Sequence, residues 1–405
     1  MNTRFIGATL LLAGISIGGA MLALPVITAI YGFVVATILF VIAWAYLTFT
    51  ALLILEINLW MPEGSNFIFM ANKTLGKVGG AITWLSYLLL FYSLLAAYIT
   101  GLSGLTVSDA SYYFHIHTYP WIASIITIIL FSVIIYLGTR CVDMLNRLFM
   151  VGLIITYILL CILVTPHATH LDLHYIDLHA WWLALPIVTT AFGSHIVIPS
   201  MRTYLQGNVK LLRWAIILGS TITLLVYLFW EALILGSLPI KDSSYSLHAI
   251  LLSGQPQVGL ANALSVLLHN SWVGDGFRWF ALLAICTSLL GVAFSLFDFL
   301  SDGFNIKKTH GGKLMTATLT FLPPFIYALF YPKGFVLALS YAGAIVAILL
   351  GILPASMAWW GRYKLSLAEQ AHYRVHGGRI MLLLVGFFSL LVIMSQFASV
   401  FKFSL

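Results

Sequence analysis

Two glycine-containing stretches in the middle of long apolar segments have the chemistry to bind a zwitterion. Residues 11–25 read LLAGISIGGAMLALP, and residues 186–199 read PIVTTAFGSHIVIP. Glycine allows the backbone to leave a helix and to approach a ligand closely. A helix that restarts near residues 18–20 would offer free N–H groups and a positive dipole end to a carboxylate. Carbonyl groups freed at residues 193–195 would accept hydrogen bonds from an ammonium group.

The two stretches take corresponding places in the two halves of the chain. Paired interruptions of this kind point to a binding site made from unwound helices. For the first stretch the alternative is close helix packing, because Gly14 and Gly18 form a GxxxG pattern. The expected binding residues at these breaks are Gly14, Ser16, Gly18, Gly19, Ala20, Gly193, Ser194 and His195.

Titratable side chains inside apolar segments make proton transfer the second kind of chemistry to consider. His195 lies in mid-segment, and the ordinary pKa of imidazole, about 6.5, suits proton exchange near neutral pH. Glu56 and Asp298 lie near the cytoplasmic ends of their segments. A charge buried at the centre of a span costs roughly 2.5–3.5 kcal/mol. We expect the coupling proton on His195, then Glu56, then Asp298. Pairing with basic residues is the alternative for the two carboxylates, and Glu231 is expected at the membrane interface.

Aromatic and hydroxyl side chains complete the candidate site. Tyr92 and Tyr98, with Ala96, Ala97 and Gly101 leaving room beside them, could wall a pocket for an aromatic side chain, together with Phe192. Thr287 and Ser288 could complete a cation site with carbonyl groups of the first break. Hydrogen bonding between helices is the ordinary role of such hydroxyls in a membrane span.

The elements that must position these residues are membrane helices. Of the 405 residues 61% are hydrophobic and 8% are charged, whereas soluble domains carry about 25% charged residues. A span needs roughly 20 apolar residues. The chain is therefore expected to be an all-α integral membrane protein with eleven spans: 5–30, 32–59, 79–106, 119–138, 144–165, 181–204, 213–236, 279–301, 314–331, 335–359 and 380–401.

The order of the spans predicts one transmembrane domain, 1–405, made from two inverted halves. Spans one to five (1–165) and six to ten (181–359) would form a five-plus-five inverted repeat with the first and sixth spans broken. Because five is odd, the second half enters the membrane upside down relative to the first. The segment 380–401 adds one helix outside this plan.

The distribution of basic residues predicts the orientation. With a cytoplasmic N-terminus, fifteen of the 19 Lys and Arg residues fall inside, and Lys241, Arg278, Lys333 and Lys402 fall outside. This bias predicts a multi-pass protein of the bacterial inner membrane with a periplasmic C-terminus. The first apolar run, continuing to Ile30, is too long for a typical signal peptide, so we interpret it as an uncleaved helix. The scattered basic residues form no groove for nucleic acid.

Other signatures of chemistry are missing from the sequence. It contains no P-loop, GxGxxG, GxSxG or HExxH motif, so we expect neither an enzyme nor a bound cofactor. The run HATHLDLHYIDLH at 167–179 does not have the spacing of metal ligands, and we expect no metal site. Cys141, Cys161 and Cys286 show no pairing pattern.

Four stretches identify the chain as resembling the bacterial hydroxy- and aromatic-amino-acid permeases nearly end to end. They are AGISIGGAMLALP (13–25), YSLLAAYITG (92–101), SLLGVAFSLFDFLSD (288–302) and TFLPPFIYALFYPKGFVLALSYAG (320–343). The resemblance implies an eleven-span member of the amino acid–polyamine–organocation superfamily. It also implies proton-coupled uptake of tyrosine or a related aromatic amino acid, and a five-plus-five inverted repeat.

The chain departs from the family pattern in two places. The family tends to have Gly-Ala-Gly in the first break, where this chain has Gly18-Gly19-Ala20, and an aromatic residue where this chain has Ser194. If Ser194 lines the side-chain pocket, the lost ring enlarges that pocket, so a broader aromatic or tryptophan permease is one alternative. A sodium-coupled carrier, a channel or sensor on the same scaffold, and a membrane-embedded enzyme are the others.

Overall fold

The computed structural model describes residues 3–169, 171–307, 309–370 and 373–403, and within these ranges the regular structure is entirely helical. Ten helices are long and apolar enough to cross a membrane. The pair Thr3–Ser16 and Gly19–Tyr31, bent by 49° at its break, provides an eleventh span. The all-α membrane fold predicted from composition is confirmed.

The first five spans run from the N-terminus to residue 164. The first span is broken into α1 (Thr3–Ser16), η1 (Gly19–Leu22), α2 (Leu24–Thr28) and η2 (Ala29–Tyr31). Four longer helices follow, and a short turn closes this half: α3 (Phe33–Leu59), α4 (Phe67–Phe114), α5 (Pro120–Leu137), α6 (Thr139–Val164) and η3 (Thr165–His167).

The second half repeats this order. The sixth span is broken into η4 (Trp181–Ala184), α7 (Leu185–Ala191), η5 (His195–Val197) and α8 (Ile198–Tyr204). The remaining helices are α9 (Val209–Ser237), α10 (Leu247–Ser253), α11 (Pro256–Leu267), α12 (Ser271–Gly303), α13 (His310–Phe330), α14 (Phe335–Val346), the π-helix η6 (Ala347–Ile352), α15 (Leu353–Tyr363), η7 (Leu367–Gln370) and α16 (Gly378–Phe403).

Two boundaries differ from the sequence prediction. The third span was expected over 79–106, but α4 starts at Phe67 and continues to Phe114. It is interrupted at Gly76, whose φ of 73° lies in the left-handed region that glycine tolerates. The segment between the seventh and eighth spans, which lies outside the predicted spans, folds into α10 and α11, which pack against each other.

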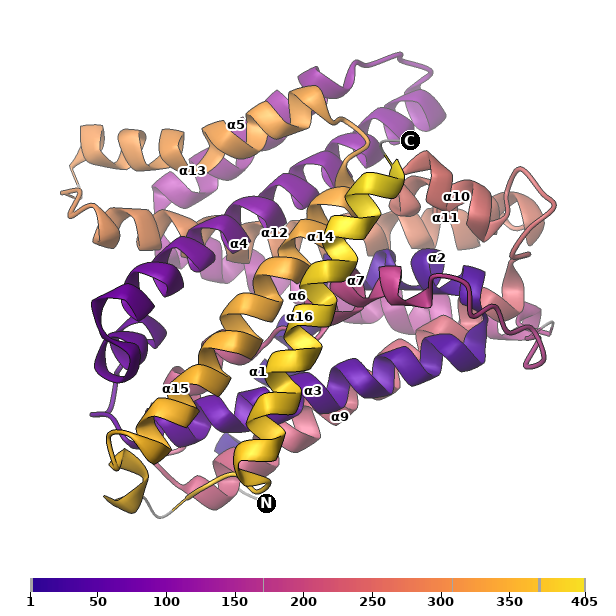
Figure 1. The fold of residues 1–405 in the computed structure, drawn as a ribbon. Coiled ribbons are helices and arrows are strands. Elements are labelled where there is room, and N and C mark those ends of the chain that lie inside the picture. Colours follow the sequence, from indigo (N-terminus) through magenta and orange to yellow (C-terminus); the bar gives the residue numbers. More distant parts are fainter. Residues whose placement is uncertain (1–2, 170, 308, 371–372, 404–405) are drawn as a thin grey trace.

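Contacts between spans recur when each span is replaced by the span in the corresponding place of the other half of the chain. The third span packs on the tenth (α4 on α14 and α15), and the eighth packs on the fifth (α12 on α6). The first packs on the seventh (α1 on α9), and the sixth packs on the second (α7 and α8 on α3). The last helix, α16, has no counterpart in this scheme and lies along α14, η6 and α15 (Figure 1).

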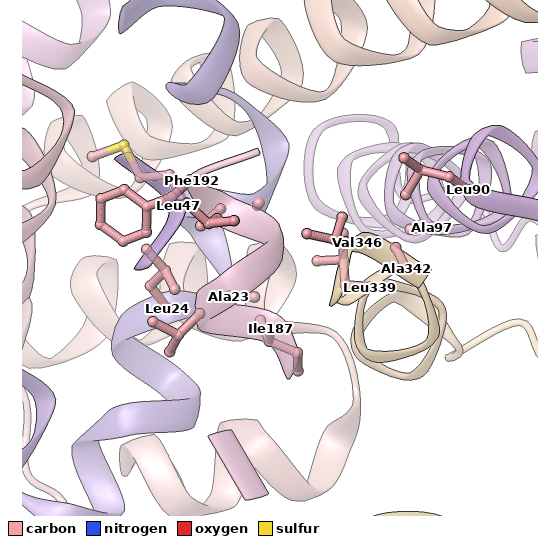
Figure 2. Close-up of a cluster of buried hydrophobic side chains, with 14 of the residues drawn as sticks. Ala23, Leu24, Leu47, Leu90, Ala97, Ile187, Phe192, Leu339, Ala342 and Val346 are labelled. Atoms are coloured by element: carbon pink, nitrogen blue, oxygen red, sulfur yellow. The ribbon is translucent and has the colours of Figure 1, made fainter. Parts of the chain in front are cut away.

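Small and branched apolar side chains pack the broken spans against their neighbours. Ala23 and Leu24, just after the first break, lie beside Ile187 of α7 (Figure 2). On the other side α14 lies between α7 and α4, with Val346 of α14 turned toward α7 and Leu90 of α4 beyond α14 (Figure 2). All five side chains are largely or fully buried. Packing of this kind replaces the missing helical hydrogen bonds as the force that positions the breaks.

Candidate functional site

The two broken spans meet at one cavity of about 520 Å³ in the middle of the bundle. The first break supplies Gly14 and residues 16–20, and the second supplies Gly193 and His195. The remaining wall comes from other residues of α1, α7 and η5 and from α4, α6, α12, α14 and η6. Its other members are Leu10, Leu11, Ile15, Tyr87, Leu90, Phe91, Leu94, Tyr98, Asn146, Met150, Thr190, Ala191, Ile196, Val197, Thr287, Ser288, Gly291, Val292, Ser295, Val346, Leu349 and Leu350.

At the first break the backbone leaves the helix at Gly18, which is extended with φ −160° and ψ −151°. The backbone N–H of Gly19 donates a hydrogen bond to Oγ of Ser288 on α12, 3.0 Å away. A Cβ atom on Gly18 would lie 2.4 Å from the same Ser288 Oγ. Glycine is therefore needed here for close approach to α12, and one of the N–H groups expected for a carboxylate is already engaged.

At the second break α7 ends at Ala191 and the chain resumes as a short turn at His195. The N–H of Gly193 donates to the carbonyl oxygen of Thr190 at 3.2 Å. The imidazole of His195 is buried, and its Nε2 lies 2.8 Å from Oγ1 of Thr50 on α3. Within the described part of the chain, its Nδ1 has no hydrogen-bond partner. A hydroxyl thus meets one ring nitrogen, and the histidine also faces the cavity.

Tyr227 on α9 connects the two breaks. Its hydroxyl lies 2.5 Å from the carbonyl oxygen of Ser16 and 2.9 Å from that of Ala191. These two residues are the last of α1 and of α7, so their carbonyl groups lack the helical partners that a continuous helix provides. One fully buried phenol therefore holds the ends of both half-helices. The sequence prediction did not include this residue.

Three of the residues predicted for the side-chain pocket do not line the cavity. The hydroxyl of Tyr92 turns away and donates to the carbonyl oxygen of Leu319 on α13, 2.8 Å away. The ring of Phe192 packs edge-on against Tyr227, with 5.2 Å between centroids. Ser194 is buried outside the cavity wall. The structure brings only Tyr98 of the predicted aromatic residues to the cavity, beside Tyr87 and Phe91.

Comparison with known proteins identifies the family of the chain that forms this cavity. The model of the tryptophan/tyrosine permease family matches residues 1–396. The chain belongs to the tryptophan/tyrosine permease family. It is therefore a multi-pass bacterial membrane transport protein and not an enzyme.

Curated relatives of this permease match it along nearly their whole length. A tyrosine-specific transport system of Haemophilus influenzae is 33% identical, with 98% of this chain and 97% of the relative covered. A tryptophan-specific transport protein of the same organism is 30% identical over 98% and 96%. A glutamine transporter of Aliivibrio fischeri is also 30% identical, over 98% of this chain and 100% of the relative. The resemblance found in the sequence is confirmed.

The cavity of the permease opens toward the end of the bundle where most basic residues lie. A second hollow of about 580 Å³ shares Tyr87, Phe91, Ile196 and Ser295 with the first. It extends to the α3–α4 loop and to the last turns of α12, where Asp298 and other residues form its wall. Asp298 also borders a smaller hollow that carries Lys307 and Lys313.

The opposite end of the permease is closed by the segment that precedes the sixth span. The hydroxyl of Tyr175 donates to the carbonyl oxygen of Ile30 at 3.2 Å, and the N–H of Asp177 donates to that of Tyr31 at 3.1 Å. The hydroxyl of Tyr31 in turn donates to the carbonyl oxygen of Ala180, 3.1 Å away. This arrangement covers the part of the first span that follows its break, at the end of the bundle opposite to the second hollow.

Glu56, one of the predicted proton carriers, lies away from the cavity in a fully buried ion pair. Its two carboxylate oxygens accept hydrogen bonds from Arg362 at 2.8 and 2.5 Å, and the N–H of Val375 donates a third at 2.7 Å. The geometry matches the pairing alternative. It joins α3 to α15 and to the segment before α16.

The position of Glu231 also differs from the sequence prediction. It was expected at the membrane interface, but its side chain is fully buried, and its Oε1 lies 2.5 Å from Oγ1 of Thr28 in α2. The reason is that α9 continues to Ser237 and is covered at this level by α2 and η3.

The two hydroxyls suggested for a cation site both line the cavity. Thr287 Oγ1 donates to the carbonyl oxygen of Ala284 at 3.0 Å, so it satisfies its own helix. Ser288 instead accepts from Gly19 and makes the contact with the first break. Among the described residues, no group of three or more His, Cys, Asp or Glu side chains could hold a metal ion.

Sequence reasoning missed the walls that α6 and the tenth span contribute, and, apart from Thr287 and Ser288, that of α12. Asn146 and Met150 come from α6, and Gly291 and Ser295 from α12. The tenth span contributes Val346, Leu349 and Leu350 at the π-helical turn. Asn146 and Ser295 are polar residues within apolar segments, which is a weak signal. The π-helical turn has no signature that the sequence displays.

Proposed function

We propose that this permease takes up tyrosine, or a related aromatic amino acid, together with protons across the bacterial inner membrane. The observation that carries the proposal is the meeting of both span breaks at one cavity with a partly aromatic wall. Half-helix ends provide charges for the ammonium and carboxylate groups that all amino acids share. The aromatic and branched residues of the wall provide a dry surface for a large apolar side chain.

The substrate carboxylate is assigned to the first break, at Gly14, Ser16, Gly18, Gly19 and Ala20. Glycine at position 18 keeps the backbone within reach, and the N–H groups beside it can donate to an anion. The ammonium group is assigned to the carbonyl groups of the second break near Gly193 and His195. An amino acid placed in this way contacts both breaks at once, the first with its carboxylate and the second with its ammonium group.

The side chain of the substrate is assigned to the space between α4 and the tenth span. Tyr87, Phe91 and Tyr98 form one side of this space, and Leu349 and Leu350 form the other. This replaces the expectation that Tyr92 and Phe192 flank the ring. Aromatic rings packed edge-on or offset against such walls gain about 0.5–1.5 kcal/mol beyond their buried area.

Alternating access is proposed to follow the five-plus-five inverted repeat, with spans one to five in 1–165 and six to ten in 181–359. The paired contacts of the third with the tenth span, and of the eighth with the fifth, support this plan. The broken spans and their partners α3 and α9 would rock against the rest. The bias of the basic residues supports a cytoplasmic position for the open side of the cavity, and we infer an inward-facing state.

Protons are proposed as the coupling ion, with His195 as the titratable group at the cavity. Asp298, in the wall of the inner vestibule, is the second candidate, whereas Glu56 already satisfies Arg362. Sodium at Thr287 and Ser288 is the alternative. The Ser288 hydroxyl oxygen already accepts the N–H of Gly19 at 3.0 Å, so a sodium ion there would use its second lone pair.

The substrate is tested by counterflow in proteoliposomes loaded with unlabelled tyrosine. We expect entry of labelled tyrosine to saturate and to be competed by phenylalanine and tryptophan but not by glutamine or leucine. Saturation and counterflow together exclude a channel, because a channel does not couple the entry of labelled tyrosine to the exit of unlabelled tyrosine. Competition by glutamine alone would contradict the aromatic assignment and favour the substrate named for the Aliivibrio relative.

A further inference from the structure

A fully buried acid on α9 has no place in the mechanism described so far. Glu231 forms no ion pair among the residues that the structure describes, and its Oε2 there has no hydrogen-bond partner. The α2 helix packed against it, LPVIT, contains no charged residue. An acid in such surroundings is rare in membrane spans and needs a functional reason.

The hydrogen bonds around Thr28 indicate which form of this acid fits the structure. Oγ1 of Thr28 lies 2.7 Å from the carbonyl oxygen of Leu24 and 2.5 Å from Oε1 of Glu231. A hydroxyl has one hydrogen, and a carboxylate and a carbonyl are both acceptors. Both contacts are satisfied together only when Glu231 carries a proton. The carboxylic acid then donates to Thr28, and Thr28 donates to Leu24.

We propose that Glu231 is a second proton-coupling group. When it is protonated, its hydrogen bond to Thr28 holds the outer half of the first span against α9. This inference rests on the proposed proton-coupled uptake. When Glu231 ionises, the Thr28 hydroxyl must turn from Leu24 to the carboxylate, which leaves the Leu24 carbonyl without that partner. A change in the protonation of Glu231 therefore changes the hydrogen bonding within α2, the half-helix that follows the carboxylate-binding break.

The proton must enter from the outer side and leave toward the cavity. The closing contacts of Tyr31 and Tyr175 lie over the outer end of α2, so Glu231 gains its proton from outside before they form. Tyr227 lies four residues earlier, on the same face of α9, and its hydroxyl reaches Ser16 at the cavity wall. This face of α9 therefore leads from Glu231 to the cavity wall.

The other titratable side chains around this part of α9 are Tyr157, Cys161 and His167. Tyr157 on α6 packs against Trp230, with 6.0 Å between ring centroids, and its hydroxyl reaches the carbonyl oxygen of Val226. Cys161 lies one turn further along α6, and His167 in η3 is bonded to the carbonyl oxygen of Leu163. None of the described Lys, Arg or His side chains forms an ion pair with Glu231.

The test compares Glu231→Gln with the wild type, because a glutamine amide donates to Thr28 as the protonated acid does. We expect Glu231→Gln to retain tyrosine counterflow but to lose accumulation on an inward proton gradient. Binding of labelled tyrosine should strengthen at low pH in the wild type, and become independent of pH in the variant. Glu63→Gln, at an exposed acid in the α3–α4 loop, is the matched control and should behave as the wild type.

A second pair of variants decides the case if Glu231→Gln does not reach the membrane. Thr28→Val removes the hydroxyl and should reduce accumulation at least 10-fold, whereas Thr28→Ser should retain it. Accumulation by Glu231→Gln or Thr28→Val at the wild-type level would overturn the role assigned to Glu231 but would leave the proposed coupling ion standing. A wild type that ignores proton gradients would overturn the proposed coupling ion itself, and this inference with it.

Discussion

The backbone N–H of Gly19 and the hydroxyl of Ser288 are joined by a 3.0 Å hydrogen bond at the break of the first span. This contact ties the half-helix that starts at Gly19 to α12, a span of the other half of the chain. A buried hydrogen bond of this kind contributes about 0.5–1.5 kcal/mol. The first break is therefore held in place by packing across the two halves as well as by its own sequence.

The first prediction uses this contact in a double-mutant cycle. Gly18→Ala places a Cβ 2.4 Å from Ser288 Oγ but 3.8 Å from Ser288 Cβ. We therefore expect Gly18→Ala alone to weaken tyrosine binding at least 10-fold, and Ser288→Ala to restore part of that loss in the double variant. Gly386→Ala is the control, because a Cβ there meets nothing within 4 Å. A loss of binding free energy in the double variant equal to the sum of the two single losses would show that the two positions act independently.

A second prediction concerns the buried pair of Glu56 and Arg362. Glu56→Gln leaves a guanidinium uncompensated, since both side chains have no exposed surface. Removing one partner of a buried ion pair costs about 3–5 kcal/mol, so we expect a clear fall in the unfolding temperature in detergent. Asp143→Asn, which breaks the exposed pair with Arg147, should change it little. Unaltered stability in Glu56→Gln, with loss of gradient-driven uptake, would return Glu56 to the proton carriers.

The third prediction concerns the width of the side-chain pocket. Phe91 lines the cavity, so Phe91→Ala should enlarge it and improve competition by tryptophan relative to tyrosine several-fold. Ser194 lies outside the cavity wall, so Ser194→Ala should leave the order of competitors unchanged. Inhibition constants from labelled tyrosine uptake measure both effects. A change of order in Ser194→Ala alone would show that Ser194 helps to shape the pocket.

The fourth prediction concerns orientation. Fifteen of the 19 Lys and Arg residues lie on the side of the N-terminus, so we expect that side in the cytoplasm. A periplasm-active reporter fused after residue 405 should be active, and one fused in the loop between α12 and α13 should not. The reverse pattern would invert the direction assigned to the open cavity.

The breaks themselves were predictable because glycine weakens a helix in mid-span and lets the backbone approach a ligand, and both breaks lie at the cavity. The aromatic wall was only partly predicted. At about 100° per residue, Tyr87 and Tyr98 lie on nearly one face of a helix, and Tyr92 lies about 120° away from Tyr98. This periodicity was in the sequence, but the face that meets the cavity depends on the partners of α4. Tyr227 and the burial of Glu231 were missed because the depth of a side chain depends on what covers its helix.

The most direct test of the account is accumulation of labelled tyrosine in proteoliposomes under separately imposed gradients. With an inward proton gradient and no sodium, we expect the internal concentration to rise well above the external one, and to collapse when a protonophore is added. With an inward sodium gradient at equal pH on both sides, we expect equilibration only. Accumulation driven by sodium and indifferent to protons would contradict the proton-coupled mechanism, and would move the ion to Thr287 and Ser288.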